Sequence, residues 1–116
     1  MNLFGDIDNW TGIVKTIYGG YTVTQRDRIV CCGKGIVECA VVLPPAALVK
    51  GFPFLFYYIS PDTLGYAVTI SPVGSERFIM PSGLVPSLVV HTEGDYLITY
   101  SDGIYWHVLG YVNLDL

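Results

Sequence analysis

Short stretches of alternating apolar and polar residues run along most of the chain, separated by turn-forming residues. Residues 21–24 alternate an aromatic or branched side chain with a hydroxyl, as a half-buried β-strand does. Residues 27–32 form a second such stretch, and residues 36–43 form a third after the Gly-Lys-Gly turn at 33–35. These stretches predict strands, because a period of two places successive side chains on opposite faces of a sheet.

The middle of the chain continues the pattern. Residues 54–59 are apolar on both faces, which indicates a strand with no water on either side. Residues 66–71 alternate again, and so do residues 95–101. In the last of these stretches the opposed sets are Tyr96, Ile98 and Tyr100 on one face, and Asp95, Thr99 and Ser101 on the other.

A tight hairpin turn is predicted at Asp102-Gly103, because this pair suits the positive φ angles of such turns. The strand that returns from it is expected to carry Ile104, Trp106 and Val108 on its inner face. A single helical turn is expected within residues 44–51, which begin with two prolines and end with glycine.

The fold expected from this pattern is all-β: one short-stranded β-sandwich or barrel-like domain spanning residues 12–116. Thirteen glycines and seven prolines interrupt the chain at the intervals typical of that class. Residues 1–11 differ and form an N-terminal arm, which is expected either to dock on a partner or to pack at the edge of its own domain. The apolar residues of the arm recur at near-helical spacing and are Leu3, Phe4, Ile7 and Trp10.

Composition adds a constraint on the surface. Hydrophobic residues make up 52% of the 116 residues and charged residues only 14%, with a mean hydropathy of +0.49. A domain of this size leaves about one third of its unfolded surface exposed. That exposed third is too poor in charge to face water everywhere, so we expect identical copies to share part of it.

Membranes and nucleic acids are not expected as partners. The longest apolar run is far shorter than the roughly 20 residues of a membrane-spanning helix, and residues 1–10 lack the pattern of a signal peptide. The chain is therefore expected to be made in a cytoplasm. Its net charge is −4, and its six Lys and Arg residues are scattered, whereas phosphate binding needs clustered cations.

Catalytic, metal and cofactor sites are not predicted either, and the chain is not expected to be an enzyme. Neither His91 nor His107 lies in a catalytic motif, and the acidic residues fall mostly in predicted turns. Cys31, Cys32 and Cys39 lack the spacing of a zinc site. Cys31 and Cys32 should point to opposite faces of a strand and act as small apolar residues.

Several ordered segments carry a resemblance to a known family. They are residues 21–24 with Asp27 and Ile29, residues 43–46 with Lys50-Gly51, residues 68–74, and residues 97–101 with Asp102-Gly103 and Trp106. In this order the segments resemble a small β domain of tailed-phage tail fibres, head fibres and capsid decoration proteins. The resemblance covers residues 20–109.

The resemblance implies a homotrimer around a three-fold axis, located in the virion. The chain is expected to be a capsid decoration (cement) protein or a head-fibre protein that binds and stabilises the capsid. Its expected partner is the major capsid protein or another virion protein. The alternative is the receptor-binding tip of a tail fibre that recognises a host glycan, and a third reading is a monomeric β-sandwich binding module. The arm residues are expected to dock on the capsid. The trimer contact is expected from Phe54, Phe56 and Tyr58, or from the alternate set Leu55, Tyr57 and Ile59.

Overall fold

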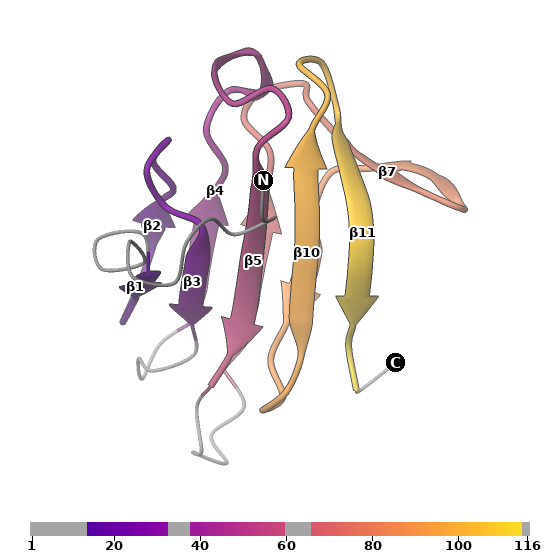
Figure 1. Ribbon diagram of the computed structural model, residues 1–116. Helices are drawn as coiled ribbons and strands as arrows, with labels where there is room; N and C mark the ends of the chain where they lie inside the picture. Colours follow the sequence, from indigo (N-terminus) through magenta and orange to yellow (C-terminus); the bar gives the residue numbers. More distant parts are fainter. Residues whose placement is uncertain (1–13, 33–37, 60–65, 115–116) are drawn as a thin grey trace.

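The computed structural model describes residues 14–32, 38–59 and 66–114, and these residues form two stacked β-sheets (Figure 1). The all-β prediction is confirmed in the described residues: the one helical segment there is a 3₁₀ turn, Ala46–Leu48, within the predicted helical turn. The expected arm residues Leu3, Phe4, Ile7 and Trp10 lie outside the described residues.

The larger sheet has seven strands in the order β1-β3-β5-β10-β11-β7-β8. The bounds of these strands are β1 Val14–Thr16, β3 Ile29–Cys32, β5 Pro53–Tyr58, β10 Tyr96–Ser101, β11 Trp106–Val112, β7 Phe78–Met80 and β8 Gly83–Val85. The smaller sheet has the order β2-β4-β6-β9, with bounds β2 Tyr21–Thr22, β4 Cys39–Val42, β6 Val68–Ser71 and β9 Leu88–Val90.

The chain alternates between the two sheets from β1 to β7. Neighbours in the sequence therefore lie in opposite layers, and β1, β3 and β5 lie side by side and parallel. The pairs β2–β4 and β4–β6 are parallel for the same reason. Parallel neighbours need a crossover connection, which is usually a helix, but here the crossover is a strand of the other sheet.

The core lies between the sheets and is built from alternate residues of each strand. Phe54 and Phe56 of β5 are fully buried, and the ring of Phe54 meets that of Trp106 edge-on at 5.7 Å. Val41, Val68 and other branched residues close the core from the smaller sheet. Burial of this kind stabilises the fold by roughly 25 cal/mol for each Å² of apolar surface removed from water.

The β10 strand keeps the predicted alternation but buries its polar side. Asp95, Thr99 and Ser101 are 0% exposed, whereas Tyr96 and Tyr100 lie on the outer face of the sheet. Each buried polar group has partners: Thr99 donates to the carbonyl of His107 at 2.6 Å, and Ser101 donates to the carbonyl of Ala46 at 2.6 Å. Burial of polar groups is tolerated when they are hydrogen-bonded in this way.

Two expectations for neighbouring strands need correction. Ile104 is 67% exposed because it lies in the turn before β11, whereas Trp106 is buried as expected. The β5 strand has only one side in the core, and its other side forms part of the outer face of the larger sheet.

Candidate interaction surface

The outer face of the seven-stranded sheet is the surface feature that most distinguishes this molecule. The strand register arranges its side chains in three rows that run across the sheet. We call these side chains the outer face. Row by row they are Leu84, Ile79, His107 and Tyr100; then Ile98, Leu55, Ile29 and Val14; and then Val112, Tyr96, Tyr57, Cys31 and Thr16.

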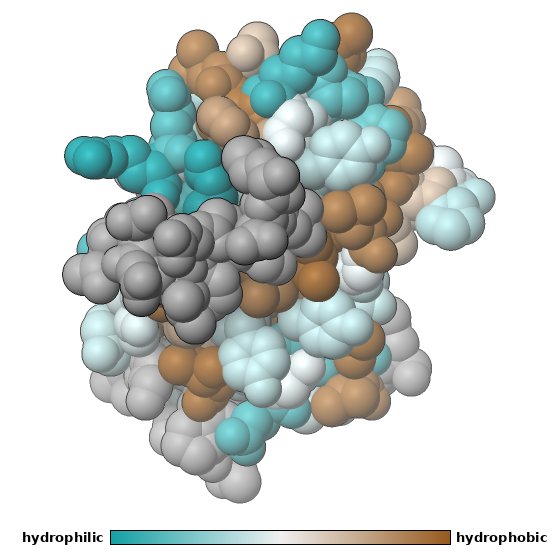
Figure 2. All heavy atoms as spheres, in the orientation of Figure 1, coloured by the Kyte–Doolittle hydropathy of each residue, from teal (hydrophilic) through white to brown (hydrophobic). Residues whose placement is uncertain are grey.

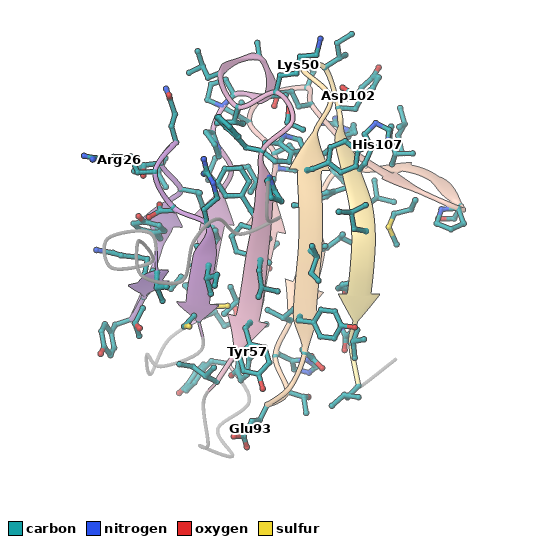
Figure 3. The ribbon with its side chains drawn as sticks, in the orientation of Figure 1. Arg26, Lys50, Tyr57, Glu93, Asp102 and His107 are labelled. Atoms are coloured by element: carbon teal, nitrogen blue, oxygen red, sulfur yellow. The ribbon has the colours of Figure 1, made fainter. Side chains whose placement is uncertain are left out.

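No Asp, Glu, Lys or Arg occurs in these rows of described residues. The charged side chains lie at the margins: Figure 3 shows Arg26, Lys50, Asp102 and Glu93 around the periphery of the sheet. Figure 2 views the same side: brown and pale residues make up much of the surface that is not grey, and teal residues lie mostly toward its margins. A sheet face that meets water normally carries polar side chains, so this face has the composition of a covered one.

Two tyrosines pair across the outer face, and an exposed leucine lies in β11. Tyr57 is 39% exposed and pairs across the sheet with Tyr96, while Leu109 is 56% exposed at a bulge in β11. Gly110 lies under Tyr96, because a Cβ on this glycine would lie 3.4 Å from the tyrosine ring. The absence of a side chain at Gly110 therefore lets Tyr96 lean over β11.

His107 is the one histidine on the outer face, and it is held from two sides. Its Nε2 lies 2.7 Å from Asp102 Oδ2, and its ring stacks on Tyr100 with centroids 4.8 Å apart. Asp102 also accepts hydrogen bonds from the backbone N–H groups of Ile104 and Tyr105 at 2.8 and 2.7 Å. These hydrogen bonds, led by that of Tyr105, lower the pKa of Asp102 to about 2.

The structure places the two sets predicted for the trimer contact on opposite sides of β5. Phe54, Phe56 and Tyr58, the set predicted first, are buried in the core of their own chain. The alternate parity points outward: Leu55 and Tyr57 belong to the outer face, and Ile59 follows them just after β5. Sequence parity could not make this choice, because both sets are equally apolar.

The cysteines lie as the sequence indicated. Cys32 points into the core and Cys31 to the outer face. Burial is the main cause that raises the pKa of the Cys32 thiol to about 12, and burial also raises the pKa of Cys39. Within the described part of the chain, no three His, Cys, Asp or Glu side chains are placed to hold a metal ion.

The hairpin formed by β7 and β8 was not predicted from the sequence. Its two-residue loop, Pro81 and Ser82, is followed by Gly83 with a φ of 122°, a value that other residues rarely adopt. The signal that could have found it is the run of residues 78–90, which contains no charged residue at all.

No known protein family matches the chain, and a comparison with curated protein sequences finds no match either. Among the described residues, no helix is long and apolar enough to cross a membrane. The fold and its surface therefore define only a class: a two-sheet β domain with one uncharged outer face.

Proposed function

We propose that this chain is a structural protein of a tailed-phage virion, a homotrimer that binds and stabilises the capsid as a decoration or head-fibre protein and has no enzymatic role. The observation that carries the proposal is the uncharged outer face of the seven-stranded sheet. A surface of this kind needs a cover, and identical copies provide one without any further partner.

Charge favours association through this face. The chain has a net charge of −4, so copies repel one another wherever their acidic residues approach. The outer face avoids that repulsion, and its tyrosines suit a protein interface because they add contact area at a small cost in side-chain entropy. A trimer also presents three copies of any capsid-binding segment, so weak single contacts add up to firm attachment.

The oligomer is tested by substituting one tyrosine of the outer face. Tyr57→Asp is expected to convert trimers into folded monomers, because association would bury three unpaired carboxylates. The matched control is Leu48→Asp, which changes an exposed apolar residue of the 3₁₀ turn, outside the outer face, and should leave the trimer intact. Light scattering after size exclusion gives the mass, and circular dichroism checks the fold.

The location in the virion is tested separately. Purified trimers are expected to bind empty capsids of their own phage, and virions that lack the protein are expected to lose heat resistance. Trimers that bind host cells and not capsids would favour a tail-fibre tip. A wild-type chain that stays monomeric at high concentration would contradict the virion proposal altogether.

A further inference from the structure

The β7–β8 hairpin extends sideways beyond β11, away from the body of the sandwich (Figure 1). It is attached by a short parallel pairing, in which Phe78 and Ile79 face Trp106 and His107 of β11. Phe78 is fully buried and anchors the hairpin, and Val85 packs against the core from the returning strand. The base of the hairpin is therefore fixed, while its tip reaches past the domain.

The projecting part is apolar. Leu84 is 53% exposed, and the loop residues Pro81 and Ser82 are exposed as well. β8 is an edge strand of the sheet, and such strands usually carry a charged residue that blocks contact with other chains. Gly83–Val85 carries none, although Pro86 limits its length.

An apolar, uncharged projection needs an uncharged partner surface, because a charge buried against it would lose its water without gaining a partner. The same chain presents such a surface in its outer face. We propose that the β7–β8 hairpin of one copy lies on the outer face of the next copy, over β3 and β5. This inference rests on the proposed homotrimer and names the contact that builds it.

The hairpin and the part of the outer face over β3 and β5 lie at opposite ends of the sheet, so a contact between them is head-to-tail. Such a contact closes into a ring when the rotation between copies allows. Three copies would then bury three hairpins and three outer faces, with no patch left over.

The strand order makes it possible to test for a contact between copies, because Leu84 and Cys31 lie far apart within one chain. β8 and β3 are five strand spacings apart in the sheet, or about 24 Å. A short cross-linker between two cysteines needs them much closer than this. A link between a cysteine at position 84 and the native Cys31 can therefore form only between copies.

The experiment treats the Leu84→Cys protein in dilute solution with a short bis-maleimide. We expect covalent dimers and trimers on a denaturing gel, and peptide mapping should join position 84 to Cys31. Removing the acceptor with Cys31→Ser in the same protein should abolish the ladder. Leu48→Cys is the matched control: Leu48 is 56% exposed but lies in the 3₁₀ turn, so it should give no ladder.

A second variant tests the contact without chemistry at position 84. Leu84→Asp is expected to lower the trimer's mass to that of one chain and to speed maleimide labelling of Cys31 at least tenfold. Leu48→Asp should change neither. Labelling of Cys31 that stays slow in the dissociated Leu84→Asp protein would show that the hairpin of another copy is not what covers Cys31, and it would overturn the proposal.

The remaining outcomes separate the two proposals. Wild-type trimers without the link from 84 to 31, or a ladder that persists with Cys31→Ser, would overturn the hairpin contact and leave the homotrimer standing. A wild-type mass of one chain would overturn the homotrimer, and the hairpin contact with it.

Discussion

At the scale of single residues, Asp102 organises the turn between β10 and β11. One carboxylate oxygen holds two backbone N–H groups and the other holds the ring of His107. Gly103 completes the turn with a φ of 98°. The hairpin is thus fixed by a charged acceptor at the margin of an otherwise uncharged face.

This arrangement predicts an acid-dependent contribution of Asp102 to stability. Its pKa is about 2 in the folded chain and close to 4 when unfolded, so the carboxylate stabilises the fold above pH 4 and stops doing so as the pH falls toward 2. The free energy of unfolding of Asp102→Asn should therefore lie below that of wild type at neutral pH and meet it near pH 2. Urea titrations at several pH values would measure the difference.

The size of this effect should be small, since the Asp102 side chain is 35% exposed and solvent screens it. A difference between the two proteins that stays constant from pH 6 to pH 2, or that grows on acidification, would contradict the assignment.

The β10 strand shows where single-residue prediction stops. Alternation in residues 95–101 was predictable, but polarity alone would turn Thr99 and Ser101 toward water, and both are buried. Their partners, the carbonyls of His107 and Ala46, belong to segments outside this stretch of the sequence. Only the assembled fold reveals that a polar row faces inward and an apolar row outward.

At the scale of elements, Glu76 joins three parts of the fold. Its carboxylate accepts hydrogen bonds from the backbone N–H of Ala46, at 3.1 and 3.2 Å to its two oxygens, and from the indole N–H of Trp106 at 3.3 Å. The segment before β7 is thereby tied both to the 3₁₀ turn and to the start of β11.

Glu76→Ala is expected to lower the free energy of unfolding by about 1–3 kcal/mol, because both donors lose their partner in a partly buried site. Glu76→Gln should cost less, since its amide oxygen can still accept one of the bonds. Urea unfolding measures both changes. The control is Glu93→Ala, which removes an exposed acid. If the two alanine variants lowered the free energy of unfolding equally, Glu76 would not stabilise the fold through these hydrogen bonds.

The strands with long alternating patterns were predictable, namely β3, β4, β5, β6 and β10. The three-residue strands β7 and β8 were not, because so short a pattern has no measurable period, and because Pro81 lies in the turn and Pro86 follows β8 directly. The residues of the outer face could likewise be predicted only in part from the sequence. Its strand β5 could be predicted as apolar on both sides, but the choice of Leu55 and Tyr57 as the outer set depends on which side the smaller sheet covers.

At the scale of the whole molecule, the alternating path of the chain explains the unequal sheets. Each passage from β1 to β7 adds one strand to each layer in turn, whereas β7–β8 and β10–β11 are hairpins that stay within the larger sheet. The larger sheet therefore has three more strands than the smaller one, seven against four. Its outer face is broad enough to serve as an interface, while its inner face still covers a complete core.

An interface built on that face should respond to solution conditions as an apolar contact does. Raising NaCl should leave the trimer intact or strengthen it slightly, because no ion pairs are screened within the outer face while the repulsion between chains of charge −4 is reduced. Cooling should weaken it, since the hydrophobic contribution falls at low temperature. Sedimentation at concentrations near the dissociation midpoint would measure both trends. Dissociation by NaCl would mean that charged residues outside the outer face hold the copies together, and it would exclude this face as the main contact.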